Sequence, residues 1–266
     1  MSNIKLILQY DGSAYIGWQR QAVQHGLSVQ QAVEEALARV VGQHCGLHGA
    51  GRTDSGVHAL AQAAHFACPV AIPPHKLTLA LNHILPPDIR VRSAEEVPEV
   101  FHARFSACGK RYRYLLAADE PSAFNYRWYW PLEQLPQEQA MRQAARYLIG
   151  KYDFRHFTLS NSTVSNFVRE LSSIRVYQPT ERELPCRLET ALAIEVICNG
   201  FLYKMVRLIA ARMVAIGQGK LPPAAMAEYL AGKPPLALPP APPQGLTLME
   251  VYYDRGQRSE ERGQSM

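Results

Sequence analysis

A short loop stands out in this sequence: His48-Gly49-Ala50-Gly51-Arg52-Thr53-Asp54-Ser55-Gly56-Val57-His58-Ala59. It places Arg52 and Asp54 between Gly51 and Gly56, and glycine lets the backbone take turns that other residues avoid. In an extended segment, side chains two residues apart point the same way, so we expect the Arg52 fork to hold the Asp54 carboxylate in a fixed orientation. An Asp-Ser-Gly turn with a nearby ion pair is the structural alternative.

Strand and helix signals alternate on both sides of this loop. Apolar and polar residues alternate over residues 4–10, which predicts a strand. Ser28 followed by Gln31 is typical of a capping box, and Gly42 marks the expected end of that helix. A shorter helix is expected from Pro73 to Asn82. The segment 90–100 is expected to connect two halves of the chain.

The second half repeats this order of elements. Strands are expected at 111–117, 188–197 and 246–253, and helices at 136–149 and 201–216. The proline-rich segment 232–244 is expected to be extended, and the charged segment 254–266 to be a frayed tail. Strands mixed with helices in both halves predict an α+β fold.

Composition narrows the class of protein. The chain has 266 residues, of which 47% are hydrophobic and 19% charged, as in ordinary globular proteins. The net charge of +5 permits a polyanionic partner without requiring one. Its 5 cysteines form no Cys-x-x-Cys pair, which indicates neither a disulfide framework nor a zinc site. The absence of a signal-peptide pattern or a membrane-spanning apolar run favours the cytoplasm.

Five blocks of sequence, in order along the chain, resemble the TruA-type tRNA pseudouridine synthases. They are Tyr10–Gln21, the loop His48–Ala59, Ala103–Ser106 with Lys110–Tyr114, Gly200–Arg207 and Pro239–Leu248. The resemblance covers nearly all of the chain. It implies two ferredoxin-like halves joined into one central mixed, mainly antiparallel sheet flanked by helices, with the active cleft between the halves. The halves would span 1–100, with the aspartate loop, and 101–254, followed by a disordered tail at 255–266.

By this resemblance, Asp54 is the catalytic aspartate. Pseudouridine formation breaks the bond from ribose C1′ to uracil N1, turns the base, and joins C5 to C1′. This isomerisation needs a carboxylate, a pocket that retains the detached base and an acceptor for the C5 proton, but no metal or cofactor. The residues leave open whether Asp54 attacks C6, attacks C1′ or removes a sugar proton.

Other site residues are expected around Asp54. Arg52 would orient the carboxylate and contact a phosphate or the vacated base position, a structural ion pair being the alternative. Tyr112 matches the family's active-site tyrosine and would stack on uracil and accept the C5 proton. Arg111 and Arg113 alternate with tyrosines, a pattern that suits phosphate contacts beside stacked bases.

Five further residues carry less specific signals. Arg207 lies where the family places a third active-site residue that pairs with the catalytic carboxylate, whereas Lys204 departs from the family pattern. Tyr114 is expected to be an ordinary half-buried sheet tyrosine. Structural roles are favoured for His58, through hydrogen bonding, and for Asp11, in an Asx turn.

The resemblance implies a cofactor-free, metal-free isomerase that acts on the anticodon arm of tRNA at positions 38 to 40, as a cytoplasmic homodimer. Two other function classes remain open. One is a metal-dependent hydrolase built on His48, Asp54 and His58, whose spacing matches no known ligand set. The other is a noncatalytic RNA-binding protein with the same fold.

Overall fold

The computed structural model describes residues 2–21, 26–68, 72–159 and 165–253. The chain forms two compact units, of which one takes Met1–Lys110 with Leu248–Met266 and the other takes Arg111–Thr247. The predicted domain boundary after residue 100 stays a prediction about folding units, and the predicted tail at 255–266 lies outside the described residues.

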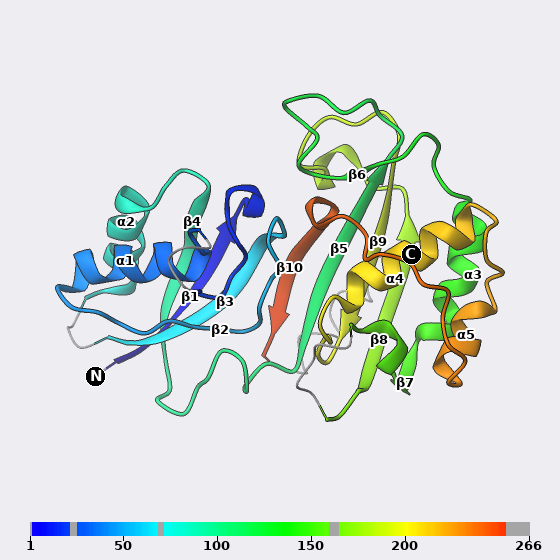
Figure 1. The fold of residues 1–266 in the computed structure, drawn as a ribbon. Helices are drawn as coiled ribbons and strands as arrows, with labels where there is room; N and C mark the ends of the chain where they lie inside the picture. The colour runs from blue at the N-terminus through cyan, green and yellow to red at the C-terminus, as the bar shows by residue number, and fades with distance from the viewer. Residues whose placement is uncertain (1, 22–25, 69–71, 160–164, 254–266) are drawn as a thin grey trace, which may run out of the picture. The chain divides into compact units, whose positions relative to one another are not determined.

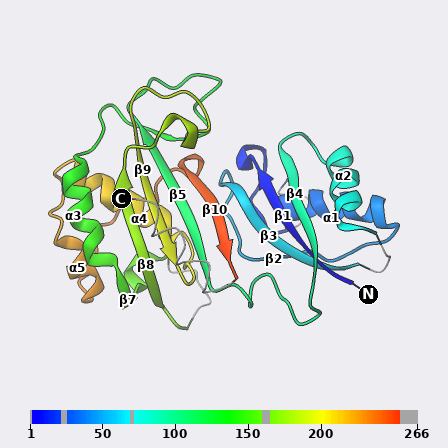
Figure 2. The same ribbon diagram turned by 180° about the vertical axis from the view of Figure 1, so that it is seen from behind.

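The first unit is built on the strands β1 (Ser2–Tyr10), β2 (His48–Gly49), β3 (His58–Cys68), β4 (Ile89–Val97) and most of β10 (Leu246–Tyr252). Their order is β4-β1-β3-β10, with β2 beside β3, and β1 is antiparallel to both of its neighbours. The helices α1 (Val29–Val41) and α2 (Pro74–Ile84) lie together at this sheet (Figures 1 and 2).

The sequence pattern explains the first elements of this unit. In β1 the apolar positions of the alternating pattern are buried, at Ile4, Leu6, Leu8 and Tyr10. Ser28 caps α1 by accepting the Gln31 amide N–H at 3.2 Å, and Gly42 ends the helix in the left-handed region. The Gln31 side chain donates to Glu35 instead of reaching back to Ser28, so only half of the predicted capping box forms.

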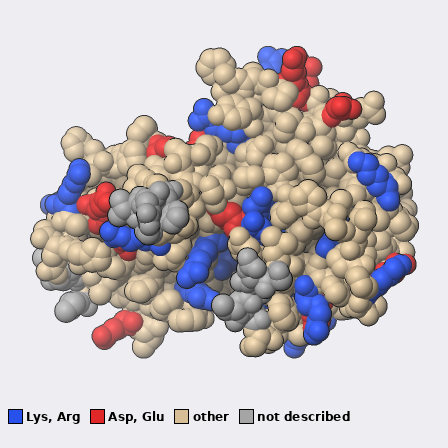
Figure 3. All heavy atoms as spheres, viewed as in Figure 1, with Lys and Arg blue, Asp and Glu red and all other residues tan. Residues whose placement is uncertain are grey.

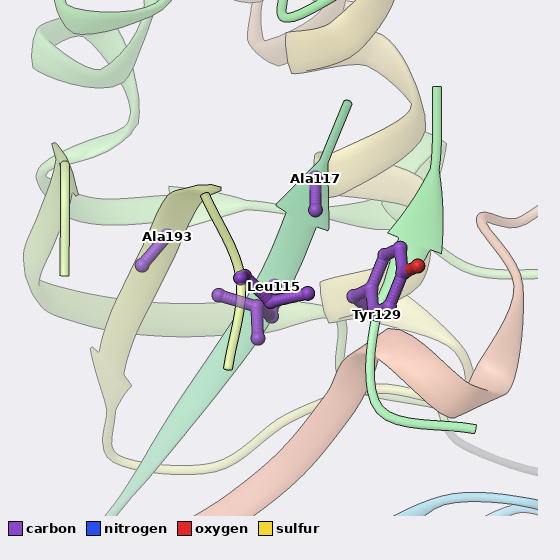
Figure 4. Close-up of a cluster of buried hydrophobic side chains, with 5 residues drawn as sticks. Leu115, Ala117, Tyr129 and Ala193 are labelled. Carbon is purple, nitrogen blue, oxygen red and sulfur yellow. The ribbon is translucent and has the colours of Figure 1, made fainter. Parts of the chain in front are cut away.

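The second unit contains the strands β5 (Gly109–Ala117), β6 (Trp130–Pro131), β7 (Gly150–Asp153), β8 (Val168–Tyr177) and β9 (Ala191–Cys198). Their order is β5-β9-β8-β7, with β6 parallel to β5. The helices are α3 (Glu138–Leu148), α4 (Met205–Gly217) and α5 (Ala225–Leu230), and α3 contacts β8, α4 and α5. Figure 4 shows part of the core beside β5, where Leu115, Ala117, Tyr129 and Ala193 pack together.

These elements confirm the predicted α+β fold with a mixed, mainly antiparallel sheet flanked by helices. The ferredoxin-like character of each half stays a prediction. Among the described residues, no helix has the length and apolar character that crossing a membrane requires.

Several boundaries differ from the predictions. The segment 90–100, expected to be a connection, is mostly strand β4, because Ile89 and Val91 turn into the core while polar residues face outward. The helix expected at 201–216 begins only at Met205, because Lys204 takes the left-handed conformation with φ 57°. Strand β9 begins at Ala191, three residues after the predicted start.

Helix α4 lies almost entirely inside its unit, because every residue except Arg207 is buried. A helix with apolar residues on nearly all sides is buried in this way, which fits the small and aliphatic residues of this segment. The other charged residue of the helix, Arg212, is buried with them. Arg207 is therefore the one residue of α4 that remains partly accessible to solvent.

Candidate active site

The backbone around Asp54 is held in place by the segment that follows β1. Asp54 and Gly17 form an isolated antiparallel bridge. The Trp18 amide N–H donates to the Thr53 carbonyl at 3.0 Å, and the Val57 amide N–H donates to the Asp54 carbonyl at 3.2 Å. Asp54 is half-buried. The carboxylate thus projects from a loop whose backbone is fixed on both sides.

Two glycines allow this close approach. Gly17 has φ 107°, and a Cβ built there would lie 2.6 Å from the Thr53 carbonyl oxygen. A Cβ at Gly12 would overlap the Val57 carbonyl oxygen. Any other residue at Gly17 would be strained and would also push against the loop that carries Asp54. The glycines of the N-terminal block therefore serve the aspartate loop.

A buried pair of hydroxyls braces the loop from inside. The Tyr10 hydroxyl at the end of β1 lies 2.8 Å from the Thr53 hydroxyl, and both side chains are buried. Burial raises the pKa of Tyr10, and the hydrogen bonds to Thr53 and Gln62 offset this only in part. Tyr10 therefore stays a neutral hydrogen-bonding group bound to Thr53, the residue that precedes Asp54 in the chain. Thr53 was not predicted as a site residue, although its position beside the aspartate was a usable signal.

His58, on the C-terminal side of the aspartate loop, is bound to Asp11 and Gly12. The buried His58 imidazole places Nδ1 3.1 Å from the Asp11 carboxylate and 3.1 Å from the Gly12 amide nitrogen. Ser13 donates to the same carboxylate oxygen from its amide at 3.0 Å and from its hydroxyl at 2.6 Å. Burial would raise the pKa of Asp11, but the bonds from His58 and Ser13 outweigh it and hold the pKa well below its usual range. These contacts confirm the predicted Asx turn and a structural role for His58.

Two charged side chains, Glu34 and Lys110, bind the backbone on the N-terminal side of the aspartate loop. Neither was predicted as a site residue from the sequence. The buried Glu34 carboxylate of α1 accepts a bond from Arg20 at 3.0 Å and one from the Leu47 amide at 3.1 Å. Lys110 donates from Nζ to the Ala50 carbonyl at 2.7 Å. Lys110 lies in a block that resembles the family, whereas Glu34 lies outside all five blocks and had no such signal in the sequence.

Arg52 lies on the surface of the first unit. Its side chain is exposed, and no ion pair joins it to Asp54 in the part of the chain that the structure describes. The predicted role of the Arg52 fork in orienting the carboxylate therefore stays a prediction. An exposed guanidinium beside the aspartate is suited to contact a substrate phosphate.

Tyr112 and Tyr114 lie on β5 in the second unit and differ in their surroundings. The Tyr112 ring is buried and packs edge-on against Phe201 at 5.1 Å between centroids. Tyr114 is fully buried, and its hydroxyl donates to the Pro242 carbonyl at 2.7 Å. Burial raises the pKa of Tyr114, which the nearby Arg207 charge lowers only in part. Tyr114 is thus a structural tyrosine of the sheet, as predicted, but it is fully buried and not half-buried.

Arg207 is held by the proline-rich segment. Its Nε donates to the Ala241 carbonyl at 2.7 Å, and the Ala241 amide donates back to the Arg207 carbonyl at 3.1 Å. Because Ala241 precedes Pro242, the same short segment binds both Arg207 and Tyr114. The closing block of the sequence therefore positions the predicted arginine.

The two arginines that alternate with these tyrosines are not equivalent. Arg113 pairs with Glu183 at 3.1 Å and with Glu195 at 3.4 Å, and only 12% of its side chain is exposed. Carboxylates within its own unit thus lie against Arg113, and its predicted contact with a phosphate stays a prediction. Arg111 is also half-buried, and its predicted contact with RNA stays a prediction.

The ligand set of the metal-dependent alternative does not form. The His48 ring stacks with His65, at 5.2 Å between centroids, and His58 lies against Asp11. Across the described ranges, no group of three or more His, Cys, Asp or Glu side chains is placed to hold a metal ion. Of the predicted site residues, Arg52 and Asp54 belong to the first unit, and Arg111, Tyr112, Arg113 and Arg207 belong to the second.

Comparisons with known proteins agree with the order of these blocks. Residues 6–106 and 144–254 match the profile of a family described as tRNA pseudouridine synthase. The protein named tRNA pseudouridine synthase A of Syntrophotalea carbinolica is 42% identical over 256 residues, which cover 95% of this chain and 97% of that protein. The protein of the same name from Geotalea daltonii is 40% identical over 255 residues, covering 95% of this chain and 100% of the relative.

Proposed function

The chain belongs to the tRNA pseudouridine synthase family, whose members are isomerases of uridine in tRNA, and we propose that it acts on the anticodon stem-loop at positions 38 to 40 with Asp54 as its catalytic group. No redox, metal or nucleotide cofactor enters this proposal, because the reaction rearranges one nucleotide without net gain or loss of atoms. The isomerisation of uridine in tRNA follows from the family. The positions 38 to 40 within tRNA are proposed from the resemblance of the five blocks.

The observation that carries the proposal is the support of the Asp54 loop. Backbone bonds to Trp18 and Gly17 and the buried hydroxyl pair of Tyr10 and Thr53 all converge on two consecutive residues. A catalytic group must be held close to its productive geometry by structure that does not reorganise during the reaction. An ordinary surface ion pair needs none of these supports.

The remaining roles are assigned by substrate chemistry. When C5 bonds to C1′, the carbon at C5 carries both the new bond and its original proton, which must leave to restore the uracil ring, while N1 gains a proton. We assign the Tyr112 hydroxyl as the acceptor of the C5 proton, and the Tyr112 ring as the surface on which uracil stacks. Arg207 is assigned to pair with the catalytic carboxylate, and Arg52 and Arg111 to contact substrate phosphates.

Charge and target structure fit this assignment. The net charge is +5, and Figure 3 shows Lys and Arg side chains in several groups on one face of the molecule. Basic groups supply most of the sequence-independent affinity for RNA. A base inside a stem must leave its stack before it can react, which costs a few kcal/mol. The proposal includes a homodimer and a cytoplasmic location, where tRNA substrates occur.

The decisive experiment compares two carboxylate substitutions in the same unit. Asp54→Asn keeps the size of the side chain and removes its charge, and Glu35→Gln does the same on the exposed face of α1. We expect Asp54→Asn to abolish tritium release from tRNA labelled at uridine C5, while tRNA affinity stays within about tenfold because phosphate contacts persist. Glu35→Gln should behave as wild type.

Turnover by Asp54→Asn above a few per cent of the wild-type rate would overturn the assignment of Asp54. Wild-type protein that binds tRNA and forms no pseudouridine would favour the noncatalytic RNA-binding alternative. Activity that is lost on chelation and restored only by Zn²⁺ or Mn²⁺ would favour the metal-dependent alternative. Mg²⁺ is kept constant throughout, because it affects the folding of tRNA itself.

A further inference from the structure

A phenylalanine and an arginine lie exposed next to each other in the loop that follows β4. Phe105 is 77% exposed, and the Arg104 guanidinium lies 5.7 Å from the centroid of its ring. Within the described ranges, Arg104 makes no ion pair, whereas Arg113 is committed to carboxylates. An aromatic face and a free guanidinium thus stand together at the surface.

This exposed ring is held in position by its own loop. The His102 ring stacks on Phe105, with 4.3 Å between centroids, and His102 Nδ1 accepts the amide N–H groups of Arg104 at 3.1 Å and Phe105 at 3.3 Å. The His102 amide donates to the Ser106 hydroxyl at 3.0 Å, and the Ser106 amide donates to the His102 carbonyl at 2.9 Å. Four hydrogen bonds within five residues fix a ring that the core does not need.

The loop is in turn tied to the strand that leads to Asp54. His102 lies 4.6 Å from the His65 ring and 5.7 Å from the His48 ring, measured between centroids. His65 Nδ1 accepts the Ala103 amide at 3.1 Å. His48 in β2 pairs with His65 in β3 and lies six residues before Asp54. A cluster of three histidine rings therefore connects the exposed ring with the aspartate loop.

We propose that Arg104 and Phe105 form a stacking platform for an unpaired base of the RNA substrate, with the Arg104 guanidinium on an adjacent phosphate. A single exposed apolar side chain is common on protein surfaces and needs no explanation. An exposed aromatic ring that is ordered before binding and accompanied by a free cation has the two groups that RNA recognition uses, a π face for the base and a positive charge for the backbone. The proposal rests on the proposed function, because it takes RNA as the ligand.

The test uses the full-length protein and unmodified tRNA transcript, with affinity measured by filter binding and turnover by tritium release. Phe105→Ala should weaken tRNA binding by about 5- to 100-fold, the range for loss of one stacked base, and raise KM with little change in kcat. Phe105→Tyr keeps the aromatic face and should stay within about twofold of wild type. Val100→Ala, at a 91% exposed position of the same connection, is the matched control and should change nothing.

A second variant tests the phosphate contact. Arg104→Ala should reduce the slope of log affinity against log salt by about one phosphate contact, and Phe105→Ala should leave that slope unchanged. Thermal unfolding of both variants should match wild type, because the substituted side chains are exposed.

Phe105→Ala with wild-type affinity and KM would overturn the platform and leave the proposed function intact. A wild-type protein that forms no pseudouridine would overturn the proposed function, and the affinities of Phe105→Ala and Val100→Ala for tRNA would still decide on the platform. A Phe105→Ala variant that changes oligomeric state and keeps its tRNA affinity would overturn the platform in favour of a protein contact.

Discussion

Gly17 and Asp54 face each other as a single antiparallel bridge, and this pairing links the N-terminal block of the sequence to the aspartate loop. The bridge depends on a left-handed backbone at Gly17, with φ 107°. Because a Cβ at Gly17 would meet the Thr53 carbonyl oxygen at 2.6 Å, the position of Asp54 is coupled to the absence of a side chain at residue 17.

Gly17→Ala should therefore impair turnover more than it impairs stability. We expect a loss of about 1–3 kcal/mol in the free energy of unfolding, and a fall in kcat of about tenfold or more from displacement of Asp54. Gly42→Ala is the matched control, because Gly42 is also left-handed, with φ 84°, but has no atom within 4 Å of a Cβ built there. It should lose stability alone. Equal kcat values in the two variants, measured by tritium release, would contradict the coupling.

The alternating pattern of β1 and the cap residues of α1 were sufficient to predict those elements, because local propensity and burial agree there. Strand β3, His58–Cys68, was not predicted, since its many alanines give neither strand propensity nor a clear alternation. The cluster of Ala50, Ala63 and Ala103 shows the reason for those small residues, which is close packing beside the aspartate loop. That requirement comes from tertiary contacts and leaves no local signal.

The site residues also divide into those with a local sequence signal and those whose contacts come from distant segments. The assignments of Asp54 and Tyr112 come from motifs and stay predictions, whereas the Asx turn of Asp11 was predicted from its local sequence and is formed. Arg113 was expected to bind phosphate, but the structure pairs it with Glu183 and Glu195, which lie 70 and 82 residues further along the chain. A charge pattern along one strand cannot reveal partners that the fold brings from distant segments.

Arg52→Lys should sharply reduce turnover on tRNA. Lysine keeps the charge but lacks the planar fork that binds a phosphate or carboxylate with two parallel bonds, so we expect about a tenfold or greater loss in kcat/KM. Arg39→Lys, at an exposed position of α1, is the control and should remain at the wild-type value. A near-normal Arg52→Lys enzyme would mean that residue 52 supplies charge alone.

Tyr112→Phe and Tyr114→Phe should separate chemistry from structure on one strand. Tyr114→Phe removes a 2.7 Å bond to the Pro242 carbonyl and should lower the free energy of unfolding by ~1–2 kcal/mol, with kcat largely kept. Tyr112→Phe keeps the ring and loses the assigned proton acceptor, so kcat should fall by ~10²–10⁴-fold. A rearranged adduct that retains the C5 proton should then accumulate. Full activity in Tyr112→Phe would reduce Tyr112 to a stacking ring.

The cluster of His48, His65 and His102 should make stability depend on pH. Burial, followed by the charges of His102 and His48, lowers the pKa of His65 to about 4, against about 6.5 in an unfolded chain. Between these values the unfolded state binds a proton that the folded state excludes, so the free energy of unfolding should fall as pH drops from about 6.5 to 4. The contribution of His65 to this loss is at most about 3 kcal/mol. Above pH 7 it should vanish, since His65 is neutral in both states.

Urea unfolding from pH 7.5 to 4 measures this dependence, and His65→Asn removes the titrating group while keeping an acceptor for the Ala103 amide. The substitution should lower stability at pH 7.5, because a buried ring is lost, and should flatten the curve between pH 6.5 and 4 relative to wild type. His44→Asn, at an exposed position, controls for the loss of any histidine and should keep the wild-type slope. If His65→Asn also keeps that slope, other groups cause the acid sensitivity, and the clustered imidazoles do not keep a proton from binding His65.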